Sequence, residues 1–158
     1  MSKEKTLAEM TALAEAWRAR GKIAVLANGA FDLLHVGHLR YLQGAKALGD
    51  VLVVAVNSDV SVRKAKGENR PVVPQAERAE MLCGLSCVDF VTVFDEADVR
   101  HIIAALKPAV HAKGTDYTQD SVPERAEVEK YGGRVAITGD PKDHSTTETV
   151  AQLSKRSR

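Results

Sequence analysis

The sequence has little of what marks a membrane, secreted or nucleic-acid-binding protein. Its 158 residues include 22 Lys or Arg and 21 Asp or Glu, so the net charge of +1 provides no general attraction to nucleic acid or to an acidic membrane surface. No apolar run is longer than a strand, and the polar N-terminus does not resemble a signal peptide. We therefore expect a cytoplasmic protein with no nucleic-acid partner and no membrane partner.

Cysteine is also scarce. The two cysteines, Cys83 and Cys87, lie four residues apart in an apolar segment, which favours small core residues over a metal site or a disulfide. What is present is ordinary: 44% hydrophobic and 27% charged residues are typical of a globular protein. The length predicts a single compact domain over residues 1–158.

Short apolar runs alternate with helical patterns along the whole chain. The expected strands are 23–27, 51–57, 88–94, 109–113 and 134–138. The expected helices are 3–20, one that contains Val36, Leu39 and Leu42, and then 58–63, 75–85, 97–106, 122–131 and 146–153. This alternation predicts an α/β fold, a doubly wound parallel sheet of five strands. The basic segment 64–71 is expected to be a mobile loop, and residues 155–158 a frayed tail.

The junction between the first strand and the next helix has the most specific chemical pattern. After the turn residues Asn28 and Gly29, His35 and His38 fall three apart on a first helical turn, so their rings share a face. Gly37 between them lets a phosphate chain approach the backbone, and a helix N-terminus attracts phosphate. Two imidazoles there can donate hydrogen bonds to oxygens that gain charge in nucleotidyl transfer. The alternative, two structural or solvated histidines paired by chance, stays open at this stage.

Other polar residues also follow expected strands. These residues are Asn28, His35, His38, Asn57, Asp116 and Ser145 to Thr147. Ser145 additionally begins a capping box, with Glu148 three residues later. Because ligands of doubly wound sheets bind at the carboxyl ends of the strands, this distribution predicts one shared site.

Two motifs resemble the signatures of the cytidylyltransferase-like nucleotidyltransferases. They are Asn28-Gly29-Ala30-Phe31-Asp32 followed by His35-Val36-Gly37-His38, and Ser145-Thr146-Thr147. The resemblance implies a Rossmann-like nucleotidyltransferase fold. It also implies attack by a phosphate oxygen on the α-phosphorus of a nucleoside triphosphate, with release of pyrophosphate. A silent nucleotide-binding module is disfavoured because both histidines and Lys66 are present.

Within that family, four further stretches resemble the D-glycero-β-D-manno-heptose 1-phosphate adenylyltransferases. The stretches are Gly49-Asp50, Lys66 to Val72, Glu77-Arg78 and Lys113 to Tyr117. They imply transfer of AMP from ATP to a heptose 1-phosphate, giving ADP-heptose for lipopolysaccharide or another surface glycan. In many bacteria this domain is fused behind a sugar kinase; here we expect the adenylyltransferase alone. The alternative is a cytidylyltransferase acting on glycerol 3-phosphate or a similar small alcohol phosphate.

The resemblance also implies roles for individual residues. The implied catalytic residues at the α- and β-phosphates are His35, His38 and Lys66. The implied nucleotide-binding residues are Asn28, Gly29, Ala30, Phe31, Gly37, Lys113, Gly114, Asp116, Ser145, Thr146 and Thr147, with Asp116 at the ribose. The implied substrate-binding residues are Asp32, Asn57, Arg70 and Arg78, with an ion pair as the equally favoured interpretation of Arg78.

The expected partners are ATP and a sugar 1-phosphate, and the expected assembly is a homo-oligomer. Mg²⁺ is expected to arrive mainly with the triphosphate, and its protein ligands are left open. The loop at 139–144 is expected to border the base. Its His144 either flanks the adenine or is simply an exposed residue ahead of the helix cap.

Overall fold

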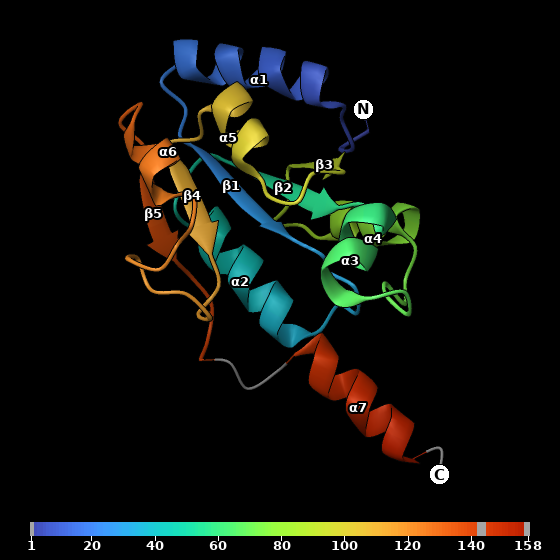
Figure 1. Cartoon of the computed structure of the whole chain (residues 1–158). Helices are drawn as coiled ribbons and strands as arrows, with labels where there is room; N and C mark the ends of the chain where they lie inside the picture. Colours follow the sequence, from blue (N-terminus) through green and yellow to red (C-terminus); the bar gives the residue numbers. More distant parts are fainter. Residues whose placement is uncertain (1, 142–144, 157–158) are drawn as a thin grey trace.

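The computed structural model describes residues 2–141 and 145–156. One five-stranded sheet, all of whose pairings are parallel, organises the fold (Figure 1). Its strands are β1 (Ala24–Gly29), β2 (Val51–Asn57), β3 (Phe90–Phe94), β4 (Val110–Lys113) and β5 (Arg134–Ile137). Their order, β3-β2-β1-β4-β5, confirms the predicted doubly wound sheet. The winding reverses between β1 and β4, the place where such sheets bind ligands.

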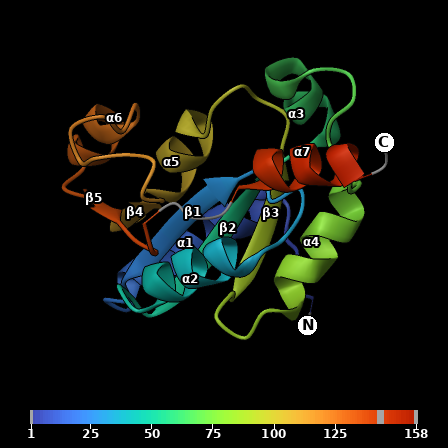
Figure 2. The same cartoon turned by 90° about the horizontal axis from the view of Figure 1, so that it is seen from below.

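Helices cover both faces of the sheet. They are α1 (Leu7–Ala19), α2 (Val36–Lys46), α3 (Asp59–Lys66), α4 (Gln75–Gly84), α5 (Arg100–Leu106), α6 (Arg125–Glu129) and α7 (Thr146–Arg156). Seen from below, α2 and α4 lie in front of the sheet and α1 lies behind it (Figure 2). Among the described residues, no helix is both long and apolar enough to cross a membrane.

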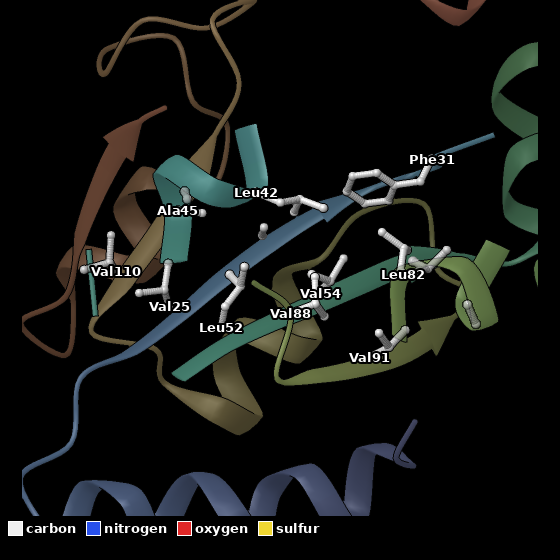
Figure 3. Close-up of a cluster of buried hydrophobic side chains, with 14 of the residues drawn as sticks. Val25, Phe31, Leu42, Ala45, Leu52, Val54, Leu82, Val88, Val91 and Val110 are labelled. Atoms are coloured by element: carbon white, nitrogen blue, oxygen red, sulfur yellow. The ribbon is translucent and has the colours of Figure 1, made fainter. Parts of the chain in front are cut away.

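The core consists of two layers, one on each face of the sheet. On one face, Val25 of β1 packs with Leu42 of α2 and Leu82 of α4 (Figure 3). On the other face, Leu26 packs with residues of α1, α5 and α6. The five central residues of β2, 52–56, are all buried, which is why that strand is a continuous apolar run.

The first helix begins later than predicted. Thr6 caps α1: its hydroxyl accepts from the amide of Glu9, whose carboxylate accepts from the amide of Thr6 at 2.8 Å. Residues 3–5 instead lie along β3, where Val91 donates to the carbonyl of Lys3 at 3.0 Å. The predicted start at residue 3 is therefore wrong, and this N-terminal segment covers part of an edge strand.

Other boundaries also differ from prediction. Residues 64–66, predicted as loop, form the last turn of α3, and the helix ends at Gly67, whose φ is +100°. Residues 155–156, predicted as frayed, belong to α7. The strand predicted to break at Asn28 continues through Gly29, whereas α5 and α6 are shorter than the predicted helices.

Candidate active site

A cavity of about 510 Å³ opens at the carboxyl ends of the strands, where the winding reverses. Every residue assigned to the site from the sequence lines it, except Arg70 and Arg78. The lining residues so assigned are Asn28, Gly29, Ala30, Phe31, Asp32, His35, Gly37, His38, Asn57, Lys66, Lys113, Gly114, Asp116, Ser145, Thr146 and Thr147. Residues from distant parts of the chain are thus brought together on one surface.

The two histidines form one stacked pair at the beginning of α2. His35 caps the helix, with its Nδ1 accepting from the amide of Gly37 at 3.1 Å. The ring centroids of His35 and His38 are 3.9 Å apart, with an interplanar angle of 21°. Phe31 lies against His38 and holds a positive φ of 49°, a conformation that non-glycine residues adopt mainly where the surroundings enforce it.

The stacked arrangement affects the charge of His38. Burial, together with the nearby positive charges of His35 and Lys66, lowers the pKa of His38 to about 4. His38 is therefore neutral at pH 7. A bound polyphosphate would place negative charge beside the ring and so favour its protonated form.

The carboxylate of Asp32 fixes the segment that follows α3. Its Oδ1 accepts from the amides of Val72 and Val73 at 2.8 and 2.9 Å, and its Oδ2 accepts from Arg70 Nε at 2.7 Å. Burial opposes ionisation, but these hydrogen bonds and the Arg70 charge keep the pKa of Asp32 below its usual range. Asp32 lines the cavity, yet its partners give it an anchoring role that the sequence did not predict.

Arg78 lies outside the cavity and is fully buried in α4. Its guanidinium donates to the carbonyl of Asn57 at 2.8 Å and to that of Ala30, and forms an ion pair with Asp59 at 2.8 Å. The tentative assignment of Arg78 to substrate binding is corrected by this placement. The equally favoured alternative, an ion pair, is what the structure contains, and Arg78 supports the backbone behind the site.

Several lining residues were not assigned to the site from the sequence. They are Arg40, Tyr41, Thr115, Tyr117, Thr138, Gly139, Asp140 and Pro141. Arg40 pairs with Asp140 at 2.5 Å, and the Thr115 hydroxyl donates to the Asp140 carbonyl at 2.6 Å. These contacts join α2 to the loops after β4 and β5.

The one feature of the sequence that could have indicated these additional lining residues is their place in the chain. They follow a strand or occupy the second turn of α2. The loop predicted to border the base contributes residues 139–141 to the lining. His144 lies outside the described residues.

The beginning of α7 forms a further part of the cavity wall. The Ser145 hydroxyl accepts from the amide of Glu148 at 3.1 Å, as the capping pattern predicts. Thr146 donates to the carbonyl of Leu33 at 3.4 Å, so this helix N-terminus adjoins the β1–α2 junction (Figure 1). Such an arrangement of hydroxyls and free backbone amides can bind phosphate.

The described residues offer no clear set of ligands for a metal ion held by the protein alone. Among the described residues, no three His, Cys, Asp or Glu side chains gather to hold a metal ion. The oxygens of Asp32 already accept three hydrogen bonds.

The chain is similar to known proteins over nearly its whole length. The sequence model of the Cytidylyltransferase-like family matches residues 26–152. Proteins named "Bifunctional protein HldE" from Geobacter metallireducens and Pelobacter propionicus are 49% and 48% identical over 96% and 98% of this chain. The chain spans only 31% and 32% of their lengths.

Two solved structures are also similar. The lipopolysaccharide core biosynthesis protein from Thermoplasma volcanium is 34% identical, with a TM-score of 0.63 over 74% of this chain and 94% of that one. Pantoate-beta-alanine ligase from Francisella tularensis has a TM-score of 0.68 over 93% of this chain and 69% of its own, but at 13% identity it shares only the fold. The resemblance stated from the sequence is confirmed, and the chain belongs to the cytidylyltransferase-like family of nucleotidyltransferases.

Proposed function

We propose that this chain transfers AMP from ATP to a heptose 1-phosphate and releases pyrophosphate. The observation that carries the proposal is the convergence of two phosphate-binding features on one cavity: the stacked histidines that begin α2 and the hydroxyls that begin α7. The sugar is proposed from the resemblance of Lys66 to Val72 and Lys113 to Tyr117 to the heptose enzymes. Similarity to the HldE proteins supports the same choice.

The reaction is a single in-line displacement. An anionic oxygen of the sugar phosphate forms a bond to the α-phosphorus of ATP. The bond from that phosphorus to the bridging oxygen breaks, and its electron pair leaves with pyrophosphate. The attacking oxygen is already ionised, so the protein needs mainly to align two polyanions and stabilise the charge that develops.

Each part of the cavity wall has a proposed task. His35 and His38 donate to α- and β-phosphate oxygens, and Lys66 supplies a positive charge from the end of α3. The hydroxyls and amides of residues 145–147 hold the β- and γ-phosphates. Asp116 binds the ribose. A magnesium ion, when bound, would neutralise triphosphate charge.

The sugar phosphate is proposed to enter beside the carboxyl end of β2. Asn57 and Asp32 line the cavity there, and Lys66 lies in the same lining. Arg70 is held by Asp32, but its buried Nη2 has no hydrogen-bond partner among the described residues. Arg70 does not line the cavity, so its role in holding the acceptor remains a proposal that rests on the resemblance to the heptose enzymes. The cytoplasmic location and the homo-oligomeric assembly remain predictions.

One assay tests the proposal. Pyrophosphate release is measured with ATP, CTP and GTP against a set of sugar 1-phosphates that includes heptose 1-phosphate, and against glycerol 3-phosphate. We expect ATP with heptose 1-phosphate to be the best pair. Higher kcat/KM for CTP with glycerol 3-phosphate would replace this proposal with the cytidylyltransferase alternative.

A further inference from the structure

Three buried titratable side chains lie next to the cavity, and the proposed reaction gives no task to two of them. His111 and Lys113 belong to β4, and Glu124 precedes α6. Their exposed fractions are 0%, 6% and 4%. Ionisable residues are rarely buried to this degree unless they are paired, so the arrangement needs an explanation.

Lys113 links three parts of the fold. Its Nζ lies 3.2 Å from Asn28 Oδ1 at the end of β1 and 3.9 Å from Glu124 Oε2. The same Nζ lies 4.7 Å from the ring centroid of Tyr117, within cation–π distance. Asn28, Lys113 and Tyr117 all line the cavity, whereas Glu124 does not.

Glu124 is held mainly by charge. Its Oε2 has no hydrogen-bond partner among the described residues and lies 3.7 Å from His111 Nε2. Burial opposes ionisation of Glu124, but His111 and Lys113 keep its pKa below the usual range. The carboxylate is therefore ionised at neutral pH, and its Oε2 lies between His111 Nε2 at 3.7 Å and the Lys113 ammonium at 3.9 Å.

The Lys113–Glu124 pair joins the two ends of a loop. Residues 114–123 form no helix or strand, yet Gly114, Thr115, Asp116 and Tyr117 of this loop line the cavity. Val122 is buried near the far end of the loop, just before Glu124. The position of the cavity-lining part therefore depends strongly on where its two ends are held.

We infer that Glu124 is a positioning residue for the nucleotide: it holds Lys113, and through Lys113 it fixes Asn28, Tyr117 and the loop 114–123 against the cavity. This inference rests on the proposed function only for the identity of the nucleotide. Glu124 touches no reacting atom, so its loss affects how well ATP binds rather than how fast bound ATP reacts.

The test compares Glu124→Gln with Glu129→Gln. Glu129 is the matched control because it is also on the α6 segment and pairs with an arginine, Arg125, but is exposed and outside the cavity. We expect Glu124→Gln to weaken ATP binding in calorimetry about tenfold, which is about 1.4 kcal/mol. KM for ATP should rise by a similar factor, with kcat within about threefold of wild type. Glu129→Gln should change neither.

Hydrogen exchange gives a second measurement that needs no activity. Amides of residues 114–123 should exchange faster in Glu124→Gln than in wild type without nucleotide, and Glu129→Gln should match wild type. If Glu124→Gln does not fold, Glu124→Asp keeps the charge and should give the same changes at reduced size.

The two hypotheses fail in different ways. A wild-type chain that does not bind ATP would overturn the proposed function, while the exchange data would still decide the role of Glu124. ATP binding within twofold of wild type and unchanged loop exchange in Glu124→Gln or Glu124→Asp would overturn the inference. A fall in kcat with unchanged ATP affinity would also overturn it.

Discussion

At the scale of single residues, the proposed chemistry uses His38, which can stabilise negative charge on phosphate oxygens without being positively charged before the nucleotide binds. His38 is neutral in the free protein because burial and neighbouring positive charge lower its pKa to about 4. A neutral imidazole still donates one hydrogen bond, and the negative charge of a bound phosphate raises its pKa and so favours protonation. The stacked pair with His35 is suited to a reaction in which negative charge grows on phosphate oxygens.

Replacing His38 with alanine should therefore damage turnover more than folding. We expect His38→Ala to lower kcat by about a hundredfold or more, because loss of one donor to a developing oxyanion costs about 3–4 kcal/mol. Pyrophosphate release by the purified variant measures the effect, and circular dichroism checks the fold. A folded variant with turnover near that of wild type would remove His38 from the mechanism.

The low pKa of His38 also predicts proton uptake when ATP binds. Triphosphate charge raises the pKa from about 4, so between that value and the new one the complex holds more protons than the free protein. ATP affinity should consequently rise as the pH falls from 7.5 to about 6. Calorimetry at pH 6 in two buffers of different ionisation enthalpy measures the uptake.

The control for that experiment is His38→Gln, which keeps a hydrogen-bond donor but cannot titrate. Proton uptake on ATP binding should be smaller in this variant than in wild type, by the amount that His38 takes up in the wild type. Equal proton uptake in wild type and His38→Gln would show that another group takes the proton.

Single residues also show where sequence reasoning stops. The spacing of His35 and His38 was enough to place their rings on one face, since three residues make almost one helical turn. Residue spacing could not predict the role of Arg78, because its partners Asn57 and Asp59 belong to other elements, β2 and α3. Glu124 was missed for the same reason: only the fold brings it to Lys113.

At the scale of elements, the α3–α4 connection is the part of the site most suited to move. Lys66 ends α3, Gly67 has a positive φ, and residues 64–69 are exposed. Asp32 fixes the connection only from Arg70 onward. The stretch that we expect to move is therefore shorter than the predicted loop 64–71, and it begins near Lys66, the proposed phosphate-binding lysine.

We expect ATP with Mg²⁺ to protect this connection from trypsin at Lys64 and Lys66, because closure over a polyphosphate would order it. The measurement is the cleavage rate at these sites with and without nucleotide. Asp32→Asn, which weakens the anchor, should be cleaved faster than wild type in both conditions. Equal wild-type rates with and without ATP would exclude closure of this segment.

Element boundaries could be predicted where a local cap decides them. The pattern from Thr6 to Glu9 is a capping box, and it marks the start of α1, which the predicted range 3–20 placed too early. Ser58, the first residue of the predicted range 58–63, caps α3, with its hydroxyl accepting from the amide of Ser61. The end of α3 was harder to predict, since Lys64 and Lys66 suit both a basic loop and a last helical turn.

At the scale of the whole molecule, the alternation of strands and helices was sufficient for the fold class but not for the strand order. The reversal of winding between β1 and β4 depends on how the crossovers pack, which no local pattern records. That reversal sets the β1–α2 junction beside the loop after β4, and β5 pairs with β4 on the other side. Arg40, Thr115 and Asp140 meet there; the loop that contains Asp140 was predicted to border the base, but its contacts with Arg40 and Thr115 were not.

Base selection is a property of this whole arrangement. The loops after β4 and β5 and the second turn of α2 are joined by the Arg40–Asp140 and Thr115–Asp140 contacts, and all three parts line the cavity. Backbone N–H and C=O groups can recognise a purine edge without a dedicated side chain. A preference for one base can therefore exist although no single residue of the sequence indicates which base it is.

We expect kcat/KM for ATP to exceed that for CTP by at least about tenfold, equivalent to about 1.4 kcal/mol of transition-state binding. Arg40→Ala should reduce this ratio, because it frees the loop of Asp140, whereas Arg18→Ala, on α1 and outside the cavity lining, should leave it unchanged. Initial rates with each nucleotide and heptose 1-phosphate give the ratio. If CTP proves the better donor for the wild-type chain, the backbone of these loops selects a pyrimidine, and the heptose assignment fails with it.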